Sequence, residues 1–334
     1  MKTTSKFAAL FFATCSALCA LSQPALEAED ICPKAGETFL YNLTHFTMEN
    51  TEGEGLVWDF TALEMTEGFL EKAVISPVAR KDDGTPPEVL FLYDESYGAW
   101  GVTCNDDSLT AFYRTADHPR FKNPLHRYSD PLKFLEFPLT YGDRFTDKSY
   151  VEDNYNTDVL TEMETGVTGY GTLKLPNLTV EEVLQVKTTG EVSNLWMNKD
   201  RTAFREKHVT RETIYSYWAK GYPFPLLKAV KLDDDFSADF LLTKLPVHAE
   251  MENINVGIAL YDDSVGVWIR EDIVFAGLYD LQMNKLFEWR GKDFVRNKYG
   301  HHMMKYNAPE PGFYIFVAKT KDKTYCAVEQ YRSY

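Results

Sequence analysis

The chain has 334 residues, of which 44% are hydrophobic and 25% charged, and these are ordinary values for a globular protein with room for two domains. It carries 35 basic and 50 acidic side chains, which give a formal net charge of −15 at pH 7. Such an acidic surface repels phosphate backbones and anionic lipid, so the composition argues against nucleic acid and anionic membranes as partners.

The first 22 residues are typical of a secretory signal peptide. Lys2 and Lys6 precede an apolar run over 7–21 that is too short to remain in a bilayer, and small residues stand at the cleavage offsets. We therefore expect a secreted mature chain that begins at Gln23. No later segment reaches the roughly 18 consecutive apolar residues of a membrane-spanning helix, so the mature chain is not expected to span a membrane.

Five cysteines are present, and Cys15 and Cys19 fall within the signal peptide. The mature chain keeps Cys32, Cys104 and Cys326. In an oxidising compartment one pair could form a disulfide and leave one thiol over, but the spacing does not select a pair. Because no Cys-x-x-Cys motif indicates a metal or redox site, the favoured interpretation is that all three are buried small apolar side chains.

Charge divides the mature chain into two parts. Residues 255–334 carry 11 basic and 10 acidic side chains, whereas residues 23–254 carry 22 and 40. A shift of this size favours a domain boundary near residue 245. We therefore expect a signal peptide over 1–22, an acidic domain over 23–245 and a second domain over 246–334.

Short apolar–polar segments between turn signals indicate that the acidic domain is built from strands. The clearest candidates are 56–60, 89–93, 99–104, 109–114, 144–151 and 159–162. Residues 23–35 are expected to form a loose polar leader. Helical periodicity is limited to two weak segments, 63–73 and the first half of 195–219. The pattern predicts an all-β, sandwich-like domain.

The stretch 166–189 predicts a β-hairpin. Alternating leucines in its first half are typical of a strand with one buried face, and the extended pattern resumes after Pro176-Asn177, with an acidic loop between the two strands. Gly169 and Gly171 lie inside the first strand, where glycine indicates a bulge or a close backbone approach. With no third glycine and no following helix, they do not form a dinucleotide-binding motif.

The last 80 or so residues show the same alternation more clearly. The candidate strands are 256–261, 267–269, 273–278, 285–289, 313–318 and 325–331. Their spacing and total length predict a small immunoglobulin-like β-sandwich. The fold class expected for the whole chain is therefore all-β, with an N-terminal β-sandwich-like domain followed by this C-terminal β-sandwich.

Two blocks of the sequence resemble cargo proteins of the type IX (Por) secretion system. The later block is similar to the C-terminal sorting domain of that family, through the segments 277–281 (GLYDL), 285–287 (KLF) and 311–317 (PGFYIFV). The earlier block resembles an N-terminal region that commonly precedes such sorting domains. It consists of the segments 58–60 (WDF), 137–142 (FPLTYG), 169–176 (GYGTLKLP), 183–187 (VLQVK) and 218–227 (WAKGYPFPLL). The resemblance implies passage across an outer membrane, with the C-terminal domain read by the export machinery, and it carries over no catalytic residue.

No residue set indicates a catalytic, cofactor or metal site. His301-His302 is an adjacent histidine pair, but neighbours on a strand point to opposite faces and would not converge on one ion. Acidic clusters at 82–83, 105–107, 233–235 and 262–263 could offer oxygen ligands to Ca²⁺. None has the spacing of a twelve-residue calcium loop, and solvated turns explain them.

Motifs of the common hydrolases are also missing. The sequence has no nucleophile elbow, no His-Glu-x-x-His and no papain-like cysteine context, and a glycosidase pair cannot be chosen from 50 acidic residues. Trp58, Trp100, Trp196 and Trp218 could stack on sugar rings or partner surfaces. Core packing is the favoured interpretation for each of them.

Taken together, the patterns and the resemblance favour a secreted or cell-surface protein without catalytic activity that binds a protein or a glycan. Two alternatives stay open: a secreted, glycoside hydrolase-like enzyme with its carboxylate pair in the N-terminal domain, and a structural surface component. A concave cleft with two facing Asp or Glu side chains would favour the enzyme, whereas a convex or filled domain would favour binding.

Overall fold

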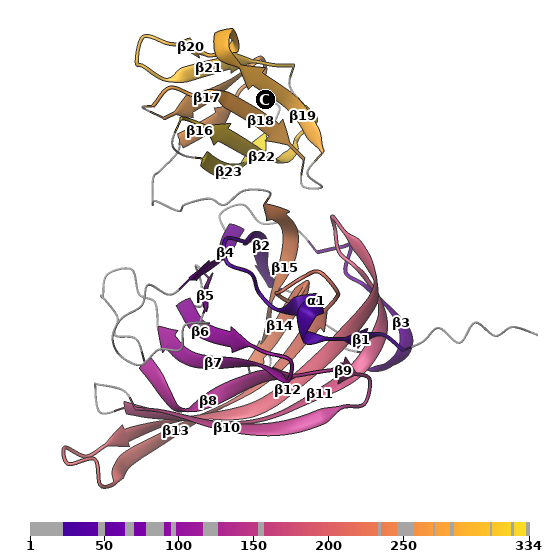
Figure 1. Ribbon diagram of the computed structural model, residues 1–334, viewed down its shortest axis with the longest axis vertical. Coiled ribbons are helices and arrows are strands. Elements are labelled where there is room, and N and C mark those ends of the chain that lie inside the picture. The colour runs from indigo at the N-terminus through magenta and orange to yellow at the C-terminus, as the bar shows by residue number, and fades with distance from the viewer. Residues whose placement is uncertain are drawn as a thin grey trace, which may run out of the picture.

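The computed structural model is built almost entirely from strands, so the all-β fold class expected from the sequence is confirmed (Figure 1). The structure describes residues 23–45, 51–63, 70–77, 90–94, 98–115, 126–152, 157–232, 235–245, 257–269, 271–280, 284–307, 309–321 and 324–331. The expected signal peptide and the acidic cluster at 82–83 lie outside these residues. Among the described residues, no helix has the length and apolarity that crossing a membrane requires.

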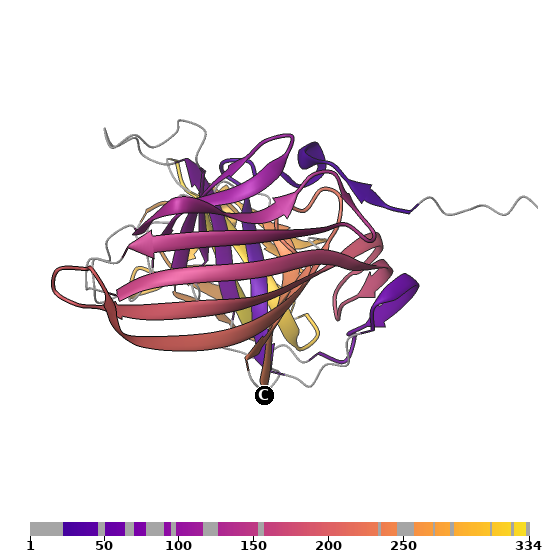
Figure 2. The ribbon, with the colours of Figure 1, turned by 90° about the horizontal axis from the view of Figure 1, so that it is seen from below.

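The N-terminal domain is one antiparallel sheet that closes on itself (Figure 2). Each strand of the ring pairs with the next one along the chain, and the last, β15, pairs with the first, β2. In chain order the ring strands are β2 (Thr38–His45), β4 (Leu70–Pro77), β5 (Leu90–Asp94), β6 (Gly98–Cys104), β7 (Ser108–Thr115), β8 (His126–Glu136), β10 (Arg144–Glu152), β11 (Thr157–Lys174), β12 (Thr179–Met197), β13 (Phe204–Trp218), β14 (Leu227–Leu232) and β15 (Asp235–Leu245).

This closed ring differs from the sandwich-like arrangement expected for the domain. Both arrangements alternate buried and exposed side chains along short strands, so the period-two pattern does not distinguish them. The difference lies in pairing between strands distant in sequence, such as β15 with β2, which no local signal encodes. Each expected strand of this domain overlaps a strand of the structure, although 56–60 extends one residue past β3 and 89 lies outside the described residues.

The predicted hairpin is the longest pair of strands in the ring. β11 and β12 turn through Pro176 and Asn177, with Leu175 and Leu178 exchanging backbone hydrogen bonds of 2.7 and 3.4 Å, which is tighter than the acidic loop expected. The register shifts at the two glycines, as a bulge requires. A Cβ on Gly171 would lie 1.9 Å from the carbonyl oxygen of Leu56, so the predicted close backbone approach is confirmed.

That close approach is made by β3 (Gly53–Asp59), which is not one of the ring strands. It pairs in parallel with the second half of β11. β10 pairs with the first half, so the two strands follow each other along one edge of β11. Trp58 of β3 is buried and packs edge-on against Tyr217 at 5.1 Å between ring centroids. Glu52 binds Lys187 of β12 at 2.7 Å and holds the entry to β3.

The segment expected to be a loose leader is instead packed into the domain. It forms β1 (Ala25–Leu26), which pairs with β9 (Leu139–Thr140), and a one-turn helix α1 (Ala28–Ile31). Leu26 and Ile31 are buried in the main core cluster. The prediction from polarity was wrong because the few apolar side chains of this segment are the ones that enter the core.

Cys32, next to α1, forms a disulfide with Cys104 at the end of β6. The interpretation of all three mature cysteines as buried thiols was therefore wrong for these two. The bond joins residues 72 apart in sequence, and in the chain-entropy account a closed loop of this length stabilises the folded state by about 4 kcal/mol.

Neither weak helical segment is helical where the structure describes it. Residues 70–73 begin β4, and 64–69 lie outside the described residues. In the second segment, β12 continues to Met197 and β13 begins at Phe204, with a turn between them. The β-branched and aromatic residues of the second half predicted a strand for that half only. In the structure, both halves belong to the β12–β13 hairpin.

The C-terminal domain consists of two four-stranded antiparallel sheets that share a core (Figure 1). One sheet holds β16 (Gly257–Leu260), β17 (Ser264–Trp268), β21 (His302–Lys305) and β20 (Val295–Arg296), and the other holds β19 (Lys285–Arg290), β18 (Phe275–Tyr279), β22 (Gly312–Lys319) and β23 (Thr324–Tyr331), with a short 3₁₀ turn η1 (Gly291–Asp293). The sequence pattern predicted neither β20 nor β21, which are short and bounded by polar residues.

The two domains are packed together through β22. Tyr314 and Phe316 belong to the core between the two small sheets. The alternate residues Phe313, Ile315 and Val317 are buried in the same cluster as the core of the ring domain. Successive side chains of a strand point to opposite faces, so β22 contributes to both cores and the domains are expected to unfold cooperatively.

Candidate functional site

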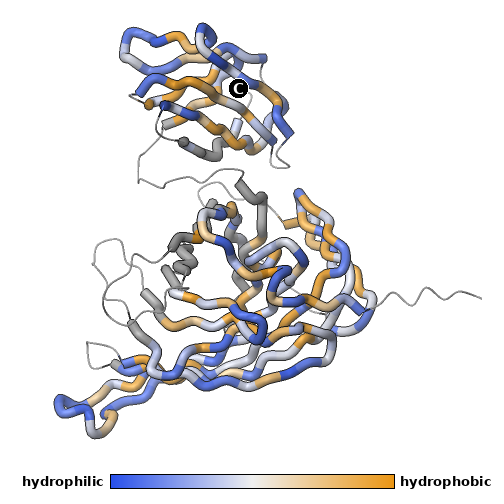
Figure 3. The backbone as a smooth tube through the Cα atoms, viewed as in Figure 1, coloured by the Kyte–Doolittle hydropathy of each residue, from blue (hydrophilic) through white to orange (hydrophobic). Residues whose placement is uncertain are grey.

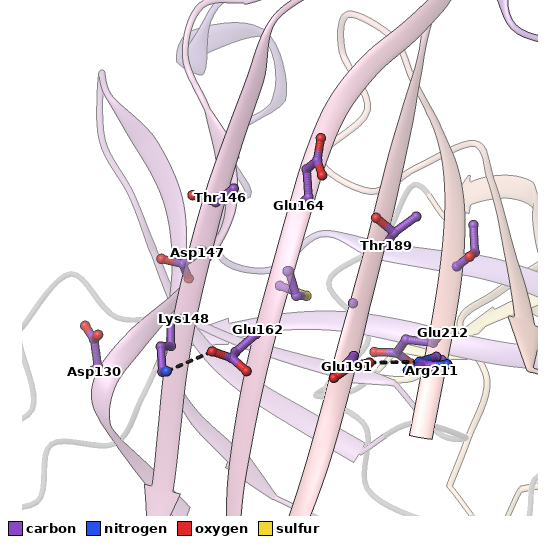
Figure 4. A pocket seen from close by; sticks show the side chains of 13 residues that line it. Asp130, Thr146, Asp147, Lys148, Glu162, Glu164, Thr189, Glu191, Arg211 and Glu212 are labelled. Carbon is purple, nitrogen blue, oxygen red and sulfur yellow. Dashed lines mark hydrogen bonds and ion pairs between the residues drawn. The ribbon is translucent and has the colours of Figure 1, made fainter. Parts of the chain in front are cut away.

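A groove of about 740 Å³ runs over four neighbouring strands of the ring, β10 to β13 (Figure 4). Cross-strand register places one row of side chains along it, because Lys148 pairs with Glu162, Glu162 with Glu191, and Glu191 with Arg211. These side chains are between 42% and 82% exposed, so the groove opens to solvent.

The row places two carboxylates directly opposite each other at its centre, between a cation on either side. Like charges opposite each other on adjacent strands repel. Here the Lys148 ammonium binds the Glu162 carboxylate at 2.8 Å, and the Arg211 guanidinium binds Glu191 at 2.8 Å, so each negative charge has its own partner (Figure 4). The two outer cations therefore offset the repulsion between the two central carboxylates.

The same contacts set the protonation state of Glu162. The hydrogen bond from Lys148 lowers the pKa of this carboxyl, and the charges of Lys148 and Lys207 lower it further. A lowered pKa means that the carboxylate stays ionised at neutral pH and accepts hydrogen bonds. It is the opposite of the raised pKa that a proton-donating catalytic acid needs.

The groove as a whole has more acids than bases. Its lining contains six carboxylates, those of Asp130, Asp147, Glu162, Glu164, Glu191 and Glu212, and two cations, Lys148 and Arg211. In the described part of the chain, Asp130 and Glu212 make no ion pair, and Glu164 has Arg144 at 3.6 Å. The groove thus offers free acceptors for ammonium, guanidinium or hydroxyl groups.

A second polar cluster stabilises the same strands close to the turn between β12 and β13. Asp158 of β11 is 2% exposed, and its carboxylate accepts hydrogen bonds from the Tyr150 hydroxyl and the Arg201 guanidinium. Arg201 lies in the turn with a φ of 56° and reaches back to β11. Burial, followed by the hydrogen bond to Asp158, raises the pKa of Tyr150 to about 12, so the phenol stays protonated and donating.

The histidine pair considered in the sequence does not converge. The His302 ring is buried, and one of its nitrogens is 2.9 Å from the Glu271 carbonyl. The His301 ring contacts Trp268, at 5.1 Å between centroids, and Tyr299. Among the described residues, no group of three or more His, Cys, Asp or Glu side chains is arranged to hold a metal ion.

The acidic clusters at 105–107 and 262–263 lie in turns between strands. Asn105 accepts hydrogen bonds from the backbone of Asp107 and Ser108 at 2.9 and 2.8 Å, which is a local turn-stabilising pattern. Asp262 accepts from the hydroxyl of Tyr331 at 2.8 Å. At 233–235, only Asp235 is described, and it begins β15.

Three of the four tryptophans singled out in the sequence have described side chains. Trp58 and Trp218 are buried, as expected for core residues. Trp196 is 50% exposed near the end of β12, so the core interpretation was wrong for this residue. The side chain of Trp100 lies outside the description.

Sequence reasoning missed the groove. Its residues are ordinary charged and threonine positions on the exposed face of long strands, and a single strand does not indicate what lies opposite it. One signal was available: Glu162 and Glu164 alternate with Met163, which marks a polar face. Which residues face each other depends on register, and register is fixed by the ring.

No protein-family model, curated protein or solved structure matches the chain. The resemblance to type IX secretion cargo therefore stays an expectation.

We predict that Arg201→Ala destabilises the protein by about 3 kcal/mol, because it leaves the buried Asp158 carboxylate with no cation. The double variant Arg201→Ala/Asp158→Asn should regain part of that loss, because its buried group is neutral. Urea unfolding followed by circular dichroism measures both. A cost below about 1 kcal/mol for Arg201→Ala would contradict the assignment of a buried ion pair.

Proposed function

We propose that this chain is a secreted protein without catalytic activity that binds a ligand in the groove over β10 to β13. The observation that carries the proposal is the central carboxylate pair, in which Glu162 and Glu191 are each bound by a cation in an open, solvent-facing groove. Fixed, ionised acceptors of this kind suit recognition. With free carboxylates beside them, they suit a ligand that presents ammonium, guanidinium or hydroxyl groups, as a basic protein segment or a glycan does.

Export is the second part of the proposal. The charged and apolar pattern of residues 1–22 supports secretion, and the similarity of the C-terminal domain to a sorting domain supports passage through an outer-membrane machinery. The Cys32–Cys104 disulfide adds support, because such bonds persist in oxidising compartments outside the cytosol. The protein would then act at the outer cell surface or beyond it.

The alternative is a secreted glycoside hydrolase that uses the same two carboxylates. Two facing glutamates in a concave site are the feature that would favour it. Against it, an acid catalyst must hold a proton near neutral pH, whereas Lys148 lowers the pKa of Glu162. The side chains of the pair are also 50% and 42% exposed, which leaves little shielding from water. Binding is therefore the better supported function.

The groove is tested with an oligolysine peptide as a probe and Asp130→Asn/Glu212→Gln as the variant. We expect the wild type to bind the peptide and the variant to bind it several-fold more weakly, because two free acceptors are lost. Nuclear magnetic resonance titration measures this, with shifts expected on β10 to β13. The matched control is Glu271→Gln/Glu310→Gln, which removes two exposed carboxylates from the C-terminal domain. Equal weakening by both variants would show only general charge attraction.

A parallel assay tests the enzyme directly. Wild type and Glu162→Gln/Glu191→Gln are incubated with a panel of oligosaccharides, and released reducing ends are measured. We expect no release from either. Release by the wild type that the double variant abolishes would replace the binding proposal with the hydrolase.

Export is tested by cell fractionation of the full chain beside a version that ends at residue 254. We expect the full chain outside the cell or on its surface and the shortened chain in the periplasm. Protease resistance of the shortened chain controls for its folding, because β22 packs on both cores. Retention of both chains in the periplasm, or equal export of both, would remove the sorting role.

A further inference from the structure

Beyond the groove, the ends of β12 and β13 form a ribbon, residues 196–209, that extends past β14 (Figures 1 and 2). β11 pairs with β12 as far as Trp196, so only the tip of the ribbon, residues 197–204, also extends past β11. β14 pairs with β13 only as far as Glu212. Phe204, at the start of β13, lies eight residues further along, which is about 27 Å for an extended strand. In the described part of the chain, the edge of β13 over 204–211 therefore has no partner strand.

The ribbon exposes large apolar side chains. Trp196 is 50% exposed, Phe204 is 56% exposed, and Val209 is also exposed. Trp196 pairs across the ribbon with Glu206, and the next residue pairs with Phe204, so the two aromatic rings belong to neighbouring positions. Phe204 lies on the unpaired edge of β13, whereas Trp196 pairs with Thr157 of β11 and Glu206 of β13. Solvent-exposed tryptophan and phenylalanine side chains are typical of a surface that becomes buried in a complex.

The ribbon is also basic, in contrast to the chain that carries it. Its four basic and two acidic residues give a charge of +2, within a chain of −15. Lys199 and Arg205 are exposed and make no ion pair among the described residues, whereas Arg201 is held by Asp158 and the charge of Lys207 already acts on Glu162 of the same chain. The ribbon thus presents free cations beside exposed aromatic rings, as protein–protein hot spots do. Figure 3 shows the polar turn and the apolar positions on its two arms.

The groove has the complementary charge. It contains six carboxylates and two cations, and Asp130 and Glu212 are free of ion pairs in the described structure. The turn of the ribbon cannot reach its own groove, because the ribbon continues the groove strands β12 and β13 away from it. β12 ends at Met197, six residues beyond Glu191, which is about 20 Å for an extended strand, and Lys199 lies in the turn after it. The occupant must therefore come from another molecule.

We propose that the ribbon of one copy of this chain binds in the groove of a second copy. Lys199 and Arg205 then face the free carboxylates of the partner, and Trp196 and Phe204 lose their exposure to water. The inference rests on the groove being the binding surface, and it names the ligand. The like net charge of two copies opposes association, but ions at physiological strength screen it beyond about 8 Å, whereas contacts within the groove are closer than that.

The experiment is sedimentation equilibrium at physiological salt, with the full mature chain. We expect the wild type to self-associate as its concentration rises. Lys199→Glu/Arg205→Glu, which changes the charge of the ribbon from +2 to −2, should lower the association constant at least about tenfold, because like charges then meet in the groove. Asp130→Lys/Glu164→Lys/Glu212→Lys, which changes the charge of the groove lining from −4 to +2, should do the same. Both sets of side chains are at the surface, and circular dichroism checks that each variant folds.

The mixture of the two reversed variants is the decisive sample. In the mixture, the acidic ribbon of the first variant meets the basic groove of the second, and the basic ribbon of the second meets the acidic groove of the first. The mixture should therefore associate, although each variant alone stays monomeric. Trp196→Ala/Phe204→Ala should weaken wild-type association, whereas Trp268→Ala, a change at another partly exposed tryptophan, should not. A monomeric wild type, or association that survives both reversals, would overturn the proposal. Oligolysine binding by a monomeric wild type would leave the groove a binding site and remove self-association alone.

Discussion

The closure of the sheet through β11 is the constraint on which the rest of the structure depends. β11 pairs with β12 along its length, with β10 over its first half and with β3 over its second half. The pairing of β10 joins the two ends of the strand order, so the ring has no free edge there. The pairing of β3 requires Gly171, because any side chain at that position would collide with the backbone of Leu56.

A closed ring fixes register, and register creates the groove. A slip of one residue between two strands would move every side chain to the other face, so a ring with a buried interior allows one alignment only. That alignment places Glu162 opposite Glu191 and a cation on each outer side. The groove is therefore a product of the topology, and each carboxylate of its central pair is bound by one cation. The ribbon arises from the same strands, because β12 and β13 are longer than the β14 strand beside them.

Much of the fold follows from local signals in the sequence. Period-two alternation locates the strands, and Gly169 and Gly171 indicate the bulge and the close approach before any contact is known. Pairings between distant strands are outside such reasoning, so β15 with β2 and the resulting ring were not predicted. The Cys32–Cys104 bond belongs to the same class, since three cysteines allow several pairings and only their positions in space select one. Polarity also misled at residues 23–35, where two apolar side chains decide the outcome.

The candidate site was the part least accessible from sequence. Charged residues on exposed strand faces are common, and nothing in a single strand distinguishes a solvated face from half of a cross-strand pair. Trp196 shows the converse error, because tryptophans of a β protein usually lie in the core and this one lies on a ribbon. Whether these side chains are buried, exposed or paired depends on where neighbouring strands end, and the closed ring determines those ends.

Amide hydrogen exchange in β10 tests the ring most directly. In the closed sheet, residues 144–152 form nine consecutive residue pairs with β11, and the amides that point towards β11 are hydrogen-bonded to it. The account predicts that they are protected as strongly as the amides of β12 that bond to β13. If β10 amides directed towards β11 exchange as fast as those of a free edge strand, the sheet is open at this point, and neither the groove nor its charge row exists as described.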